Sequence, residues 1–126
     1  MTKTRSSFIL AIGWLIASII LLTLPGSAFP KENWLNKIWA DKWIHVILFA
    51  VLIVLWCRAT GRVSKNNSIK KYFIVIAILG IAYGIGMEFV QEYLVTSRSF
   101  DRGDIIADTA GCLAGLGFSL LRYIKK

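Results

Sequence analysis

Four long apolar segments, separated by polar stretches, dominate the pattern of the chain. They cover residues 8–24, 41–57, 72–94 and 104–124. Each approaches the roughly 20 residues that an α-helix needs to cross about 30 Å of hydrocarbon. No segment alternates strictly between apolar and polar positions, as the strands of a membrane barrel do. The pattern therefore predicts an all-α, polytopic transmembrane four-helix bundle that forms a single domain over residues 1–126.

Composition agrees with a membrane protein. Of the 126 residues, 56% are hydrophobic, and the mean hydropathy is +0.63. A soluble domain of this size would expose too much apolar surface. The formal net charge of +8 would suggest nucleic acid as the partner of a soluble protein. In a membrane protein, loop Lys and Arg residues face anionic lipid headgroups, so we expect membrane lipid and no nucleic acid as a partner.

The basic residues also predict the orientation. Ten of the fifteen Lys and Arg residues lie in the N-terminal stretch, in the loop between segments 41–57 and 72–94, or at the C-terminus. Positive residues concentrate in cytoplasmic loops, so both termini are expected in the cytoplasm of a multi-pass protein of the cell membrane. Trp34, Trp39 and Trp43 suit an outer interfacial belt.

The first segment has an alternative interpretation as a cleaved signal peptide over residues 1–28, because Gly26, Ser27 and Ala28 follow the apolar run. That run is longer than the usual 7–15 residues, which favours a retained helix. The orientation of the remaining helices is the same in both cases. Cys57 and Cys112 fall near opposite halves of the bilayer, so no disulfide is expected between them.

Ionisable side chains lie at one depth on three of the segments. Asp41 and Asp104 open their helices at the outer surface, which puts His45 and Asp108 roughly 6 Å deep at a rise of 1.5 Å per residue. Glu88 reaches the same level from the opposite direction. Gln91 lies slightly higher, and Arg98 falls in the loop above. Ionisable groups at bilayer depth usually face a protein interior or a wet cavity, so they are functional-site candidates.

The acids share a helix face with small residues. Positions at helical spacing form one stripe on each of two segments, and each stripe contains a small-xxx-small pair that lets helix backbones approach closely in lipid. The acids are therefore expected to point into the bundle. The stripes are Asp104, Asp108, Gly111 and Gly115 on one segment, and Gly80, Gly84, Glu88 and Gln91 on the other.

The order and spacing of these motifs resemble the VanZ-like membrane protein family. The residues that carry the resemblance are Asp41-Lys42-Trp43-Ile44-His45 with Phe49, Tyr83-Gly84 with Glu88 and Gln91, and Arg98-Ser99-Phe100-Asp101 with Asp104, Asp108, Gly111 and Gly115. The family pattern often has Asn where this chain has Asp108. The resemblance implies a small bacterial multi-helix protein of the inner membrane. The family is named for a protein linked to resistance to teicoplanin, a glycopeptide antibiotic with a lipid tail.

Three hypotheses follow for the polar residues. In the first, they bind an envelope lipid or a lipidated antibiotic at the outer leaflet, and the protein contributes to teicoplanin resistance. Lys42 and Arg98 would contact the anion of such a ligand. A proton-linked transporter is a variant that would need a homodimer, because four helices are few. The ligand-binding candidates are Asp41, His45, Glu88, Gln91, Arg98, Asp104 and Asp108.

In the second hypothesis the protein is a metal- or acid/base-dependent membrane enzyme that acts on a lipid-linked phosphate or glycan, such as a cell-wall intermediate. Imidazole and carboxylate suit a divalent metal such as zinc or manganese. The catalytic candidates are Asp41, His45, Glu88 and Asp108, and the metal candidates are His45, Glu88 and Asp108. The spacing matches no dedicated metal motif.

In the third hypothesis the polar network only packs the helices, without a ligand. Polar contacts between membrane helices average only about 0.6 kcal/mol. A charged residue at mid-helix costs about 2.5–3.5 kcal/mol to insert. Packing alone is therefore an inefficient reason to keep several acids. The sequence leaves open whether the protein is an enzyme.

Overall fold

The computed structural model describes residues 2–23, 40–63, 69–94 and 102–123. These ranges contain four helices: α1 (Thr2–Leu22), α3 (Ala40–Val63), α4 (Ile69–Leu94) and α5 (Arg102–Tyr123). All four are long and apolar enough to cross a membrane, and the described chain contains no strand. The predicted all-α transmembrane bundle is confirmed.

The helices are longer than several of the apolar segments that predicted them. α1 begins at Thr2, α3 continues to Val63, and α4 begins at Ile69. The added turns carry basic residues such as Arg5, Arg58 and Lys70. Long basic side chains can keep their charge at the membrane surface while their stems cover apolar surface, so charge does not end a helix there.

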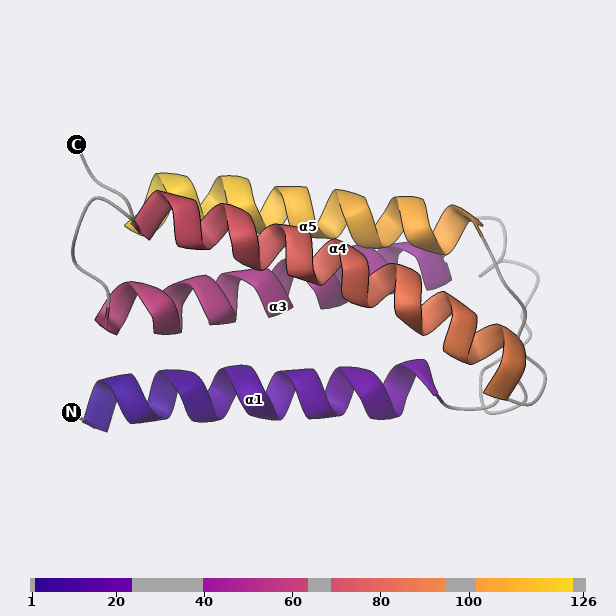
Figure 1. The fold of residues 1–126 in the computed structure, drawn as a ribbon, viewed down its shortest axis with the longest axis horizontal. Helices are drawn as coiled ribbons and strands as arrows, with labels where there is room; N and C mark the ends of the chain where they lie inside the picture. The colour runs from indigo at the N-terminus through magenta and orange to yellow at the C-terminus, as the bar shows by residue number, and fades with distance from the viewer. Residues whose placement is uncertain (1, 24–39, 64–68, 95–101, 124–126) are drawn as a thin grey trace.

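Successive helices run in opposite directions. The first turn of α1 and the last turn of α5 lie at one end of the bundle, and α3 and α5 both begin at the other end (Figure 1). The expected placement of both termini on one side of a membrane agrees with this arrangement. Which side that is stays a prediction from the basic residues.

α3 is the central helix and packs against each of the other three. Phe49, Ile53 and Cys57, spaced four residues apart, are at most 1% exposed. α1 is attached to α3 by a hydrogen bond in which Trp14 Nε1 donates to the carbonyl of Leu48 at 3.0 Å. In lipid, such bonds and close packing hold helices together, because burial of apolar surface gives no advantage over contact with lipid.

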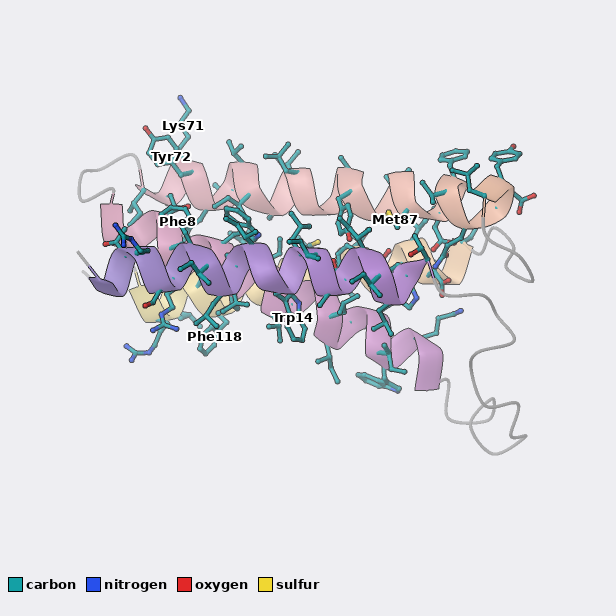
Figure 2. The ribbon with its side chains drawn as sticks, turned by 90° about the horizontal axis from the view of Figure 1, so that it is seen from below. Phe8, Trp14, Lys71, Tyr72, Met87 and Phe118 are labelled. Carbon is teal, nitrogen blue, oxygen red and sulfur yellow. The ribbon has the colours of Figure 1, made fainter. Side chains whose placement is uncertain are left out.

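Side chains on different faces of α4 differ in their surroundings. Lys71 and Tyr72 point away from the bundle at the start of the helix, whereas Met87 lies on the side that faces α1 (Figure 2). Met87 is 8% exposed and belongs to the core. Phe73 and Ala77 in the first half of α4 are buried as well, so α4 packs against the bundle along much of its length.

α5 lies against α3 through glycines that leave no room for a side chain. A Cβ atom on Gly111 would overlap the carbonyl oxygen of Val46, and one on Gly115 would come within 2.6 Å of the carbonyl oxygen of Ala50. On α4, a Cβ atom on Gly84 would lie 2.8 Å from Asp108 Oδ2. The small-residue stripes thus form the contacts of α5 with both neighbouring helices.

Gly111→Ala is expected to destabilise the bundle by about 1–3 kcal/mol, because the added methyl group meets α3 backbone that cannot move aside cheaply. Thermal unfolding in nanodiscs, followed by circular dichroism, measures the effect. Gly117→Ala is the matched control, since nothing lies within 4 Å of its Cβ position. The control should be neutral or slightly stabilising, because Ala favours helix over Gly. Equal melting temperatures for both variants would contradict the packing described here.

Candidate functional site

Polar side chains gather inside the bundle at the end where α3 and α5 begin and α4 finishes. We call this set the polar cluster; it consists of Lys42, His45, Glu88, Gln91, Asp104 and Asp108. Apart from Lys42, each member is buried, with an exposed fraction of 6% or less. Three helices contribute to the polar cluster, and the acids point into the protein rather than toward lipid.

Helical spacing explains why these residues meet. Asp104 and Asp108 are one turn apart on α5, as are Gly84 and Glu88 on α4. Residues four apart lie on one face of a helix. Because Gly84 has no side chain, Asp108 can approach the α4 backbone directly beneath Glu88. Close packing of the two helices and convergence of their acids therefore have the same cause.

His45 is held by a hydrogen bond to Asp108, with 2.7 Å between Nδ1 and Oδ1. A carboxylate can only accept hydrogen bonds, so with Asp108 ionised Nδ1 is the donor. In a neutral imidazole the second ring nitrogen, Nε2, then carries a lone pair, and in an imidazolium it carries an N–H. It faces Asp104, with 3.8 Å between Nε2 and Oδ2. An ionised Asp108 thereby sets the orientation of the imidazole and keeps a proton on Nδ1.

Asp104 has a second partner in Lys42. The Lys42 ammonium donates to Oδ1 of Asp104 at 2.8 Å, and the two side chains are 24% and 8% exposed. Lys42 and His45 are one turn apart on α3 and so present the ammonium and the imidazole to the same carboxylate. The cation neutralises part of the charge that this carboxylate brings into the protein.

Glu88 completes a compact group with His45 and Asp104. One nitrogen or oxygen atom from each of the three side chains lies within 4.8 Å of the other two, and all three residues are buried. Carboxylate and imidazole from three helices are thus brought within the span of a single small ligand. The geometry groups Asp104, rather than Asp108, with His45 and Glu88, because Asp108 is engaged by Nδ1.

Gln91 connects the polar cluster to α1. Its Nε2 donates to the carbonyl of Leu22 at 2.7 Å. That carbonyl belongs to the last turn of α1, where helix carbonyls have no intrahelical partner. Gln91 Oε1 and Asp108 Oδ2 are buried and have no hydrogen-bond partner among the described residues.

An apolar cavity of about 350 Å³ lies deeper in the bundle. Its walls come from three helices, and its exposed wall residue Leu79, which is 62% exposed, shows that the cavity opens at the lipid-facing surface. The lining residues are Leu15, Leu52, Ile53, Trp56, Ile76, Leu79, Gly80 and Tyr83.

Tyr83 lies between the cavity and the polar cluster. It lines the cavity and is the neighbour in sequence of Gly84, which contacts Asp108. Its hydroxyl shares a 2.6 Å hydrogen bond with Ser18 Oγ of α1, and its ring packs on Phe49 with centroids 5.6 Å apart. The apolar cavity and the polar cluster are therefore adjacent along α4.

The structure brings together five of the seven residues predicted from the sequence: His45, Glu88, Gln91, Asp104 and Asp108. The side chain of Asp41 and all of Arg98 lie outside the described residues, so their roles stay predictions. The Ser18–Tyr83 bond was not predicted. A lone serine inside the apolar segment 8–24 was the only signal of it.

The His45–Asp108 contact is expected to stabilise the fold measurably. In a double-mutant cycle of His45→Ala and Asp108→Ala, the two residues should couple by about 1–2 kcal/mol, near the upper end of values for polar contacts between membrane helices. Unfolding in nanodiscs measures the cycle. The matched control pairs His45→Ala with Glu92→Gln, an exposed acid on α4. Coupling equal to that of the control would mean that the hydrogen bond does not form.

Comparison with known proteins agrees with these features. A family model described as VanZ/LLP1 matches residues 6–123, nearly the whole chain. The chain is also 30% identical over 86 residues to uncharacterized protein C11E3.10 of Schizosaccharomyces pombe. That match covers 68% of this chain and 50% of the relative, so the chain spans about half the length of the yeast protein. No solved structure matches this chain. The motifs at Asp41–His45, Tyr83–Gln91 and Arg98–Gly115 thus identify a true relationship, and the chain belongs to the VanZ/LLP1 family.

Proposed function

We propose that the protein is a membrane enzyme that hydrolyses or transfers a lipid-linked phosphate or glycan at the polar cluster. The observation that carries this proposal is the orientation of His45. Asp108 holds Nδ1, and Nε2 faces Asp104 across 3.8 Å with Glu88 nearby. An imidazole fixed by a carboxylate is the arrangement that enzymes use to activate or hold a reacting group.

The energetic cost of the polar cluster supports a role beyond helix packing. Each charged side chain at the centre of a membrane helix costs about 2.5–3.5 kcal/mol to insert, less near the interface. Contacts such as those of His45 with Asp108 return on average about 0.6 kcal/mol in membranes. Three buried carboxylates around one imidazole are therefore poorly explained as packing contacts.

The apolar cavity supports a substrate that carries a hydrocarbon chain. It begins at Tyr83, directly below the polar cluster, and extends along α4 to Ile76, about two turns farther into the bundle. Its volume of about 350 Å³ would accommodate on the order of ten methylene groups, taking each as about the 30 Å³ of a water molecule. Such a substrate would place its charged head group at the polar cluster and its hydrocarbon chain in the apolar cavity.

Capture of a ligand without chemistry is the second candidate, and the same cavity favours it. The fatty tail of an envelope lipid or of a lipidated antibiotic such as teicoplanin would fit the apolar lining, with the polar head at the cluster. Arg98, which is outside the described residues, would contribute an anion contact. The two candidates differ in one respect: capture requires the cavity, whereas catalysis requires the orientation of His45 as well.

His45→Gln and Glu88→Gln are each expected to reduce turnover at least a hundredfold, because general acid–base groups contribute about 10²–10⁴-fold to rate. The assay follows, by mass spectrometry, release of phosphate from undecaprenyl diphosphate and of a sugar phosphate from its glycosylated form, with the protein in nanodiscs. Glu92→Gln is the matched control and should keep wild-type turnover. Wild-type protein that binds these lipids but leaves them intact would contradict the enzymatic proposal and favour capture.

Ile76→Trp is expected to raise KM about tenfold for a long-chain prenyl diphosphate and to leave kcat unchanged, because the indole fills the cavity without reaching the polar cluster. A tenfold change corresponds to about 1.4 kcal/mol of lost binding. Ile78→Trp is the matched control, since Ile78 is 58% exposed on the same helix and does not line the cavity. An equal KM for both variants would show that the hydrocarbon chain does not use the cavity.

A further inference from the structure

We infer that the polar cluster binds one divalent cation of the zinc or manganese type, with His45 Nε2, Glu88 and Asp104 as its protein ligands. The inference deepens the proposed function, because it names the ion that would act at the same site. It stands on geometry of its own, and ion binding can be measured without any substrate.

The spacing of the three side chains fits a single ion. Zinc lies about 2.0–2.2 Å from imidazole nitrogens and carboxylate oxygens, so two ligands of one tetrahedral ion are roughly 3.3–3.6 Å apart. His45 Nε2 and Asp104 Oδ2 are 3.8 Å apart, close to this spacing. The set that includes Glu88 lies within 4.8 Å, so side-chain rotations that move the ligand atoms by about 1 Å complete the tetrahedral spacing.

The tautomer of His45 is the one that metal binding requires. Asp108 accepts from Nδ1 at 2.7 Å and leaves Nε2 as the nitrogen that faces the other ligands. Metal-ligating histidines almost always donate their other ring N–H to a carboxylate, a backbone carbonyl or water. Asp108 is therefore a positioning residue that orients His45, not a ligand itself.

Two acceptor atoms face each other in this arrangement. With Nδ1 protonated and the imidazole neutral, Nε2 carries only a lone pair, and Asp104 Oδ2 is a carboxylate oxygen. Two such atoms 3.8 Å apart inside a membrane protein repel each other unless a proton on Nε2 or a cation lies between them. Lys42 contacts the other oxygen, Oδ1, and so leaves the side that faces His45 to another group.

A second, independent observation comes from the buried oxygens beside these ligands. Asp108 Oδ2, on a side chain that is 2% exposed, has no hydrogen-bond partner among the described residues. It belongs to the carboxylate that holds the imidazole and lies against α4 one turn from Glu88. Gln91 Oε1, one turn beyond Glu88, is likewise buried without a partner. Buried acceptors cost free energy unless a donor or a cation satisfies them.

The chemical types of the three metal ligands, one imidazole and two carboxylates, indicate the class of ion. Imidazole suits zinc, copper, iron and nickel, whereas carboxylates suit magnesium, calcium and manganese. Catalytic zinc sites have three protein ligands and keep a fourth position open, and a set of one imidazole and two carboxylates also suits manganese. A three-ligand site at the polar cluster would leave room for water or a phosphate oxygen on the ion, which is the chemistry that the proposed function needs.

The test titrates Zn²⁺ and, separately, Mn²⁺ into the full-length protein in nanodiscs after removal of metal with a chelator. Calorimetry with Zn²⁺ and electron paramagnetic resonance with Mn²⁺ report the stoichiometry and affinity. We expect one ion per chain. His45→Gln and Glu88→Gln should each weaken binding more than a hundredfold. Asp108→Asn should weaken it about 10–100-fold, as loss of a second-sphere partner does. Glu92→Gln, the matched control, should bind like the wild type.

Zinc K-edge absorption of the wild type keeps the inference testable if a variant fails to fold, because it must show a single imidazole among oxygen ligands. No stoichiometric binding by the folded wild type, or a zinc shell without nitrogen, would overturn the inference. Turnover that persists in metal-free protein would overturn it while leaving the proposed function in place. Ion binding by a protein that hydrolyses none of the lipid diphosphates would support the inference and contradict the proposed function.

Discussion

Close contact between the backbone of α5 and its neighbours is the constraint on which the other features depend. Gly111 lies against the carbonyl of Val46 and Gly115 against that of Ala50. In lipid, helices gain nothing from burying apolar side chains against one another, so interfaces rely on such close approach and on polar contacts. This approach brings Asp104 and Asp108 to the face of α3 that carries Lys42 and His45. A side chain at either glycine would move the carboxylates away from their partners.

α4 completes the arrangement by a second close contact, at Gly84. Asp108 reaches the α4 backbone there, and Glu88 follows one turn later on the same face. The cost of placing acids inside a membrane protein is thus reduced by Lys42 and His45, whereas Asp108 Oδ2 stays without a hydrogen-bond partner among the described residues. Buried acceptors of this kind cost free energy unless water or a ligand supplies the missing partner.

The polar cluster and the apolar cavity are joined through Tyr83. Its hydroxyl bonds to Ser18 of α1, and its ring packs on Phe49 of α3. One residue therefore links three helices at the boundary between polar and apolar surroundings. A molecule with a charged head and a hydrocarbon tail has the same division, which is why the proposed substrate is a lipid.

The sequence by itself determined the helical class, the four candidate spans and the common level of the polar residues along the bundle. Apolar runs set the spans, and a constant rise of 1.5 Å per residue put His45, Glu88 and Asp108 at one level. The periodicity of 3.6 also placed the acids on the glycine stripes, which the contacts at Gly84 and Gly111 match. The described helices begin and finish outside several of the predicted limits, because basic side chains at the membrane surface do not interrupt a helix.

The pairing of individual atoms was decided only by the tertiary structure. The sequence could not show that Asp108 would engage Nδ1 while Asp104 faced Nε2 and Lys42, because both acids share one stripe of α5 and either could have met the imidazole. It also could not show the cavity below Tyr83, which exists because α1, α3 and α4 leave space between them. Helix spacing along the axis follows from local geometry. Rotation and separation of helices to within an ångström follow from side chains that meet across the bundle, and these are distant in sequence.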